Sequence, residues 1–194
     1  YIEHQLQPKL IQVIGRSLQD LKPATLHIGQ ASTEFGRSRR FPSADGRVVN
    51  RRYDAGVTEN DVPVMKIVSP TGQIRGILFG YACHNTTLAF YKFCGDYAGF
   101  AQEDVERDNP GTIAMFIMGC GGDQNPYPRH GPQGLQYARQ HGRELATAVQ
   151  RALRGNMTKI HGPLHVAADT VWLNLEPLPP VGQLQQEAAS ESGM

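Results

Sequence analysis

Apolar residues recur at intervals of three and four in two long stretches, which is the spacing of one face of an α-helix. The first stretch covers residues 2–21 and the second covers residues 133–153. Pro8 lies near the start of the first stretch, where a helix tolerates proline, and Gly155-Asn156 follows the second, as at many helix ends. We therefore predict two amphipathic helices, and we expect the tail after residue 183 to begin another.

Apolar runs of strand length occur between these helices and predict β-strands at residues 25–31, 62–68, 75–82 and 112–118. Ser69-Pro-Thr-Gly-Gln73 joins the second and third runs as a turn, which indicates a hairpin. The centres of these two strands are apolar at nearly every residue, so we expect burial on both faces under helices. The fold class is therefore α/β, with a mixed, largely buried β-sheet flanked by helices.

Two further segments complete the pattern. Residues 165–175 alternate in polarity and predict another strand, which leads into several prolines. Residues 35–60 are rich in Gly, Ser, Arg and Asp without a period, which predicts a long loop. Long loops inside compact domains are often functional. The arginines of this loop are thus either solvated surface charges or groups that attract an anionic headgroup.

The composition excludes several classes of protein. The 194 residues contain 19 Lys plus Arg against 18 Asp plus Glu, so no net field favours a nucleic-acid partner. No apolar run reaches the ~18 residues of a transmembrane helix. The three cysteines, Cys83, Cys94 and Cys120, are an odd number without metal-binding spacing, and we interpret them as buried small hydrophobic residues.

Polar residues follow two of the buried strands at the point where each strand ends. His84 follows the strand at 75–82, and Asp123 and Asn125 follow the strand at 112–118. Ligands of open α/β sheets bind at the carboxyl ends of strands, so these residues and Asp96, at the start of a predicted helix, are the candidates for chemistry. Asp96 is equally well explained as a helix N-cap.

His84 has three interpretations from its position alone: a zinc ligand, a general base, or a core histidine that a neighbour satisfies. A catalytic zinc ion needs about three protein ligands and an open position, and only His84 is a convincing ligand here. Asp96 or Asp123 could orient such a site, and backbone amides near Gly122 could hold an oxyanion.

Three blocks of the sequence, taken together, resemble the catalytic domain of the neutral/alkaline non-lysosomal ceramidase family. They are Phe79-Gly-Tyr-Ala-Cys-His84-Asn-Thr-Thr, Cys94-Gly-Asp96-Tyr-Ala-Gly-Phe and Gly119-Cys-Gly-Gly-Asp123-Gln-Asn-Pro126. Asn50-Arg51-Arg52 also resembles an upstream element of the family. The resemblance covers most of residues 1–180 and implies that residues 1–194 are the central part of a single ceramidase-like catalytic domain.

The resemblance implies a zinc amidohydrolase that cleaves the N-acyl bond of ceramide or a related lipid. His84 matches a zinc-binding histidine, Arg51 or Arg52 matches an arginine beside the active site, and Asn125 occupies the position of the catalytic serine. Because an amide cannot be acylated, catalysis would use zinc-activated water. The family's other zinc ligands would lie before residue 1 and beyond Met194.

A lipid substrate is compatible with peripheral membrane contact, and the resemblance implies a secreted protein or one at the exterior of the cell envelope. One alternative is a non-catalytic homologue that keeps the pocket as a binding surface. Another is a cysteine hydrolase that uses Cys83 or Cys120. Cys83 and His84 are adjacent on a strand and so point to opposite faces, which excludes them as a nucleophile–base pair.

Overall fold

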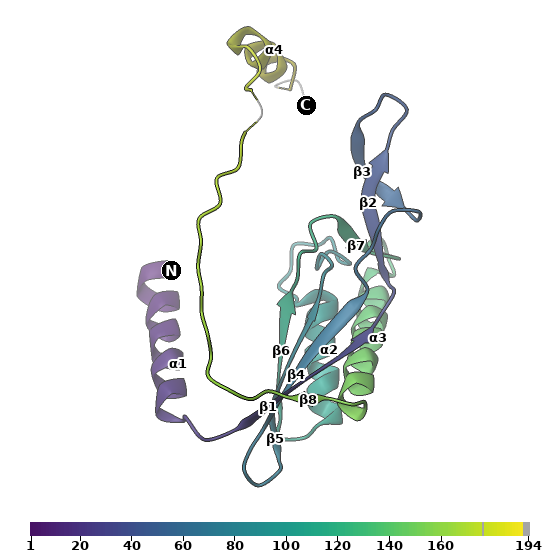
Figure 1. The fold of residues 1–194 in the computed structure, drawn as a ribbon. Helices are drawn as coiled ribbons and strands as arrows, with labels where there is room; N and C mark the ends of the chain where they lie inside the picture. The colour runs from purple at the N-terminus through teal and green to yellow at the C-terminus, as the bar shows by residue number, and fades with distance from the viewer. Residues whose placement is uncertain (176, 192–194) are drawn as a thin grey trace. The chain divides into compact units, whose positions relative to one another are not determined.

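The computed structural model describes residues 1–175 and 177–191. The chain divides into two compact units, Tyr1–His161 and Gly162–Met194, which we describe separately. Figure 1 shows the elements of both. No helix in the described ranges is both long enough and apolar enough to cross a membrane.

A five-stranded sheet organises the first unit. Its order is β6-β5-β4-β1-β8. Strand β4 pairs antiparallel with β1 and β5, whereas β5 pairs parallel with β6. The predicted hairpin and the mixed sheet are thus confirmed. The bounds are β1 (Thr25–Ser32), β4 (Asp61–Val68), β5 (Ile74–Tyr81), β6 (Ile113–Met118) and β8 (Thr158–Lys159).

Two helices, α2 (Asp96–Asp108) and α3 (Gly134–Arg154), pack on one face of this sheet (Figure 1). Val62, Val64, Ile77 and Phe79 point into the core between the sheet and these helices and are almost fully buried. The long helix predicted at residues 133–153 is therefore confirmed as α3, with its apolar stripe facing the core.

The opposite face of the sheet remains exposed in the described part of the chain. On β6, Ile113, Met115 and Ile117 are 64%, 58% and 53% exposed, whereas Ala114 between them is buried. These residues contradict our expectation that the strand at 112–118 is buried. On β4 and β5, for which we expected burial on both faces, Met65 and Leu78 are only partly buried. A run that is apolar at every position does not distinguish a strand covered on two faces from one that presents an apolar face outward.

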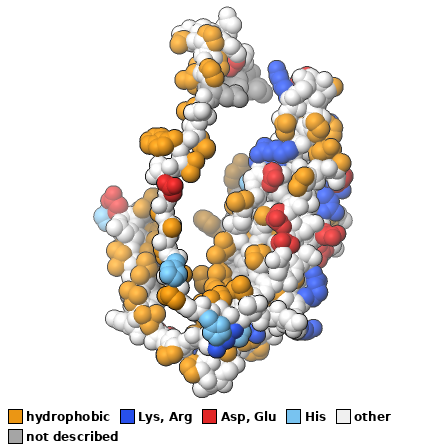
Figure 2. All heavy atoms as spheres, in the orientation of Figure 1, with side chains coloured by type: hydrophobic (Ala, Val, Ile, Leu, Met, Phe, Trp, Pro, Cys, Tyr) orange, Lys and Arg blue, Asp and Glu red, His pale blue; other side chains and the backbone are white. Residues whose placement is uncertain are grey.

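The first helix also carries exposed apolar residues. A π-helical turn, η1 (Ile2–Leu6), leads into α1 (Gln7–Gln19), as the spacing of its apolar residues predicted. Leu10, Ile14 and Leu18 are at least half exposed, and apolar side chains are visible on the surface of α1 in Figure 2. The amphipathic pattern therefore predicted the helix correctly, but its apolar side is not buried against the core.

A second, three-stranded sheet has the order β3-β2-β7. Its strands are β2 (Gly36–Pro42), β3 (Val48–Tyr53) and β7 (Gln124–Pro126). The prediction of a long loop at residues 35–60 is therefore wrong. Every residue of β3 up to Arg52 is exposed, so this strand has no buried face to impose the alternation by which strands are recognised.

The second unit contains an extended segment and one helix, α4 (Val181–Glu191). The predicted tail helix is confirmed. The strand predicted at residues 165–175 is not formed, and Val171, Trp172 and Leu173 are at least 75% exposed. An alternating apolar pattern becomes a strand only where it finds a neighbour for its backbone groups, and none pairs with it among the described residues.

Candidate active site

The ends of the parallel strands β5 and β6 meet, as the sequence predicted. The backbone N–H of His84, just after β5, donates to the carbonyl of Gln124 at 3.0 Å, and the N–H of Gly119, just after β6, donates to Tyr81 at 3.1 Å. A Cβ atom at Gly121 would lie 2.7 Å from the backbone nitrogen of Cys83. Glycine is therefore required for this close approach, which brings the turn before Asn125 against His84.

Asn125 is buried in this junction, with an exposed fraction of 1%. Its side-chain oxygen accepts a hydrogen bond from the Thr86 hydroxyl at 3.4 Å. Its side-chain nitrogen, Nδ2, is buried without a hydrogen-bond partner. Because an unmade buried hydrogen bond is costly, Nδ2 is a donor that a ligand oxygen would satisfy.

His84 also has a buried side-chain nitrogen without a hydrogen-bond partner, Nε2 of its ring. Burial lowers the pKa of His84, and the positive charges of Arg39, Arg129 and Arg40 lower it further, while Asp123 acts in the opposite direction. The imidazole is consequently neutral at neutral pH, which is the form that binds a metal ion or accepts a proton.

These properties fit His84 to the role of one zinc ligand. Within the described ranges, no group of three or more His, Cys, Asp or Glu side chains is placed to hold a metal ion. A zinc site needs about three such ligands. The described residues therefore do not form a complete zinc site, and zinc binding by His84 stays a prediction.

Asp123 and Gly122 form the exposed part of the turn. The Asp123 carbonyl accepts the backbone N–H of Arg39 at 2.8 Å. The Gly122 carbonyl accepts bonds from the guanidinium groups of Arg39 and Arg40 at 2.9 and 3.2 Å. The Asp123 carboxylate is near enough to oppose the lowering of the His84 pKa. These contacts place Asp123 near His84 and join the turn to Arg39 and Arg40, two members of the arginine-rich segment for which the sequence left open a role in attracting an anionic headgroup.

Asp96 is bound mainly to the backbone. It is 6% exposed, and its carboxylate accepts the N–H groups of Leu88 at 2.9 Å and Tyr97 at 2.6 Å. The N-cap position of α2 is Gly95, so the N-cap interpretation of Asp96 is wrong by one residue. Asp96 instead has φ of 52°, a conformation in which its carboxylate ties the loop after His84 to the helix. This is a positioning role, and a catalytic role for Asp96 stays a prediction.

Tyr97, at the start of α2, holds the backbone of Cys83, the residue before His84. The Tyr97 hydroxyl donates a 2.6 Å hydrogen bond to the carbonyl of Cys83. Cys83 itself is fully buried, and burial raises the pKa of its thiol strongly, which makes it a poor nucleophile. Cys94 and Cys120 are exposed, contrary to our expectation that all three cysteines are buried. Their place beside apolar runs did not reveal that both lie in surface turns.

Arg51 and Arg52 make their contacts at the β2–β3 hairpin and its neighbours. The Arg51 guanidinium stacks over the Phe41 ring at 3.4 Å. Arg52 pairs with Asp54 at 2.7 Å and lies 5.3 Å from the centre of the Tyr127 ring. Strand β2 separates their strand from β7. Their predicted contact with substrate therefore stays a prediction, whereas Arg39 and Arg40 contact the turn directly.

Gln124 is a residue that sequence reasoning missed. It is 1% exposed, and its side chain binds the backbone of Glu59 through two hydrogen bonds. A Cβ atom on Gly36 would lie 2.2 Å from its Nε2 atom, so β2 packs closely over it. In the sequence, Gln124 is one of several polar residues in a glycine-rich turn. Nothing in that pattern indicated that its side chain binds the backbone of a distant segment.

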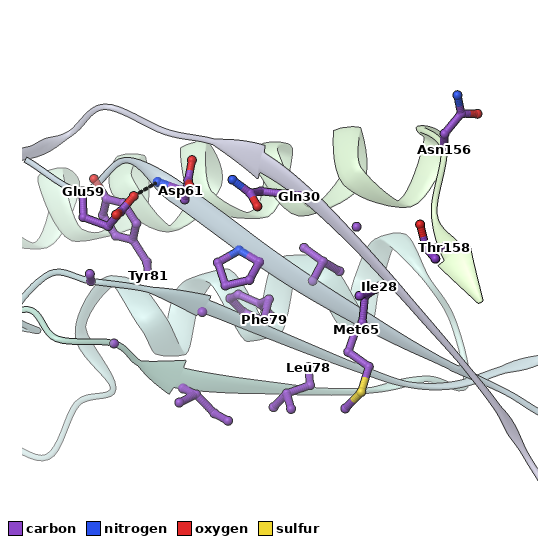
Figure 3. Close-up of a pocket in the computed structure, with 17 residues that line it drawn as sticks. Ile28, Gln30, Glu59, Asp61, Met65, Leu78, Phe79, Tyr81, Asn156 and Thr158 are labelled. Carbon is purple, nitrogen blue, oxygen red and sulfur yellow. Dashed lines mark hydrogen bonds between the residues drawn. The ribbon is translucent and has the colours of Figure 1, made fainter. Parts of the chain in front are cut away.

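A cavity of about 800 Å³ lies on the exposed face of the sheet (Figure 3). Apolar residues of the strands, among them Ile28, Met65 and Leu78, line its length. Figure 3 shows Glu59 and Tyr81 at one end, and Asn156 and Thr158 at the other. Its lining includes Ala82 and Gly119 but neither His84 nor Asn125. The cavity thus reaches the strand ends that carry the site, without containing the site.

These features define the chain as an α/β domain with a candidate site where two parallel strands end. It matches no protein-family model and no curated protein sequence. Among solved structures it is similar to neutral ceramidase from Pseudomonas aeruginosa, with a TM-score of 0.64 and 20% identity, over 79% of this chain and 26% of that one. It is also similar to a ceramidase complexed with C2, with a TM-score of 0.63 and 18% identity, over 77% and 25% of the two chains. The chain therefore has the fold of one part of these ceramidases and spans about a quarter of their length.

Proposed function

We propose that this chain is part of a zinc-dependent hydrolase that cleaves the amide bond of ceramide or a related N-acyl lipid. The observation that carries the proposal is the presence of two buried nitrogens without hydrogen-bond partners where β5 and β6 end, Nε2 of His84 and Nδ2 of Asn125. Acyl transfer to water needs an activated nucleophile and a hydrogen-bond donor for the oxyanion. Nε2 of His84 can bind the metal ion that activates water, and Nδ2 of Asn125 can be that donor. The shared fold with ceramidases supports the same reaction class.

In this proposal His84 holds the zinc ion through Nε2, and the remaining ligands come from parts of the protein outside the described residues. When bound, zinc would lower the pKa of a water molecule and polarise the substrate carbonyl. The neutral state of His84, which burial favours, keeps its lone pair available.

Asn125 has a separate role. Its Nδ2 donates a hydrogen bond to the oxygen of the scissile carbonyl as negative charge develops there. An amide nitrogen is not a nucleophile, so no acyl-enzyme forms on this residue. Asp123, exposed beside His84, is the nearest carboxylate of the turn and is suited to accept a proton from the attacking water.

A second candidate function is lipid binding without turnover. The observation that favours it is the lack of a complete ligand set for a metal ion among the described residues. A homologue that has lost its metal would keep the cavity and the amide of Asn125 as a binding surface. The two functions differ in metal content and in product formation.

Zinc content and fatty-acid release from a fluorescent ceramide, measured on the full-length protein with and without chelator, test the proposal. We expect stoichiometric zinc, chelator-sensitive release, and loss of both in His84→Ala. The matched control is His4→Ala, because His4 is an exposed histidine on the first helical turn. Asn125→Ala should keep zinc and slow release by about 10²-fold, the usual effect of losing one oxyanion donor. A protein with neither zinc nor turnover would favour the binding function instead.

A further inference from the structure

An irregularity in the β2–β3 hairpin brings two consecutive arginines to one atom. Between the pairs Ser38–Tyr53 and Arg40–Asn50, β2 advances by two residues and β3 by three, so a β-bulge interrupts the register. Successive side chains of a regular strand point to opposite faces. Here Arg39 and Arg40 both donate to the Gly122 carbonyl, at 2.9 and 3.2 Å. Bulges next to active sites commonly redirect side chains in this way.

These two arginines lack the carboxylate partner that most other arginines of the hairpin have; Arg51 also lacks one among the described residues, but it stacks on the Phe41 ring instead. Arg37, Arg47 and Arg52 on the same hairpin each lie within 4 Å of a carboxylate. Arg39 and Arg40 form no ion pair in the part of the chain that the structure describes, and each uses few of the five N–H donors of a guanidinium group. Two positive charges of β2, with free N–H donors and no carboxylate partner among the described residues, therefore contact the turn that leads to Asn125.

The adjoining buried donor indicates that this charge faces a ligand. Asn125 lies three residues after Gly122, is 1% exposed, and has no partner for Nδ2. The backbone N–H of Arg39 donates a hydrogen bond to the Asp123 carbonyl at 2.8 Å. The strand that carries the two arginines is therefore attached to the turn that leads to Asn125. Donors and positive charge without acceptors suit an anionic group.

We propose that Arg39 and Arg40 bind a carboxylate on the amine side of the substrate, so that the amide cleaved is that of an N-acyl amino acid. This inference rests on the proposed function and narrows its substrate class. An acyl chain needs apolar surface, such as the cavity that ends at Ala82 and Gly119, and gains nothing from guanidinium groups. The amine side of ceramide is a neutral diol, which would leave both charges unmatched.

Calorimetric binding to the full-length protein, in the presence of chelator, tests this inference with three short probes. N-octanoylglycine carries the amide and a carboxylate, N-octanoylethanolamine carries the amide without charge, and octanoate represents the released acid. We expect N-octanoylglycine to bind about 10-fold more tightly than the neutral amide, as a charge-assisted bidentate contact predicts. The double variant Arg39→Gln/Arg40→Gln should abolish this preference, so that N-octanoylglycine binds no more tightly than the neutral amide.

Arg47→Gln is the matched control, because Arg47 lies on the same hairpin and its side chain is 82% exposed. It should behave like the wild type. If the double variant does not fold, the salt dependence of probe binding to the wild-type protein tests the inference instead. High salt should then weaken binding of N-octanoylglycine but not of the neutral amide.

Two results would overturn the inference. One is equal affinity for N-octanoylglycine and the neutral amide. The other is octanoate binding as tightly as N-octanoylglycine with the same dependence on Arg39 and Arg40, which would assign the pair to the product carboxylate. Because the assay needs neither zinc nor turnover, a catalytically inactive protein can still support it. Failure of the hydrolase proposal is thus distinguishable from failure of this one.

Discussion

The side chain of Gln124 is hydrogen-bonded to the backbone of Glu59 at both of its polar atoms. The Glu59 N–H donates to Oε1 at 2.9 Å, and Nε2 donates to the Glu59 carbonyl at 3.0 Å. The contact joins the turn after β6 to the segment before β4, which is 65 residues away in sequence. Asn125 is the next residue, so this contact fixes the backbone that positions its amide.

Replacing Gln124 tests how strongly this anchor holds the turn. Gln124→Leu removes the hydrogen-bond partners of the Glu59 N–H and C=O, and we expect the free energy of unfolding to fall by about 1–3 kcal/mol. Urea denaturation measures it. Gln140→Leu is the control, because Gln140 binds Glu144 on the exposed surface of α3 and should change stability by less than about 0.5 kcal/mol. Equal effects of the two variants would show that the anchor contributes nothing specific.

The contact between α2 and α3 depends on a glycine. A Cβ atom at Gly142 would lie 2.6 Å from Cβ of Phe100 and 2.9 Å from the carbonyl oxygen of Tyr97. Gly142→Ala should therefore push the helices apart and cost about 1–3 kcal/mol. Gly99→Ala, on α2 with nothing within 4 Å, should be neutral or stabilising by up to about 1 kcal/mol through helix propensity. Thermal unfolding followed by circular dichroism compares them, and a stabilising Gly142→Ala would contradict the close packing.

His141 should make stability depend on pH. Its ring stacks on Phe35 with centroids 4.6 Å apart, and its Nε2 donates to the Pro128 carbonyl at 2.8 Å. Its Nδ1 is buried without a partner. Burial is the main cause that lowers the pKa of His141 below its usual 6.5, so the unfolded chain binds a proton at a pH where the folded protein does not.

By linkage, the stability contributed by neutral His141 is complete above pH 6.5 and is lost as the pH falls below it. We expect His141→Gln to be less stable at neutral pH but to lose less stability on acidification. Urea unfolding at a series of pH values compares the two proteins. Parallel curves for wild type and variant would show that another group determines the acid sensitivity.

Asp96 should contribute to stability rather than to proton transfer. Asp96→Ala leaves the N–H groups of Leu88 and Tyr97 without their acceptor and places alanine at φ of 52°. We expect a loss of about 1–3 kcal/mol. Asp96→Asn keeps an acceptor and a residue that tolerates this backbone conformation, so it should be the milder change in both stability and activity. A stable but inactive Asp96→Asn would instead support the catalytic role that the sequence suggested.

The sequence predicted the parts of this fold in which one face is buried. The stripe of α3 and the buried residues of β4 and β5 are consequences of core packing, so their pattern is visible in the sequence. His84 and Asn125 were predicted to belong to one site because both follow strands of an open α/β sheet, in which ligands bind at the carboxyl ends of strands. This was correct, as the hydrogen bond from His84 to Gln124 shows.

The β2–β3 hairpin was not predictable by the same logic, because nearly all of β3 is exposed and leaves no periodic pattern. Arg51 and Arg52 were singled out by their resemblance to a family element, whereas Arg39 and Arg40 contact the turn beside His84. A β-bulge depends on the register between two strands, which residue order alone does not specify. The anchoring role of Gln124 was missed because its partner is backbone from a distant segment.

Two neighbouring glycines of the turn offer unequal freedom for redesign. At position 121 even a methyl group would overlap the chain just before His84, whereas at position 122 an added side chain would enter open space. Variation at Gly121 should separate the two strand ends and destroy the geometry of the site. Gly122 is therefore the place where a library of substitutions can alter the shape and polarity offered to a substrate while the framework stays intact.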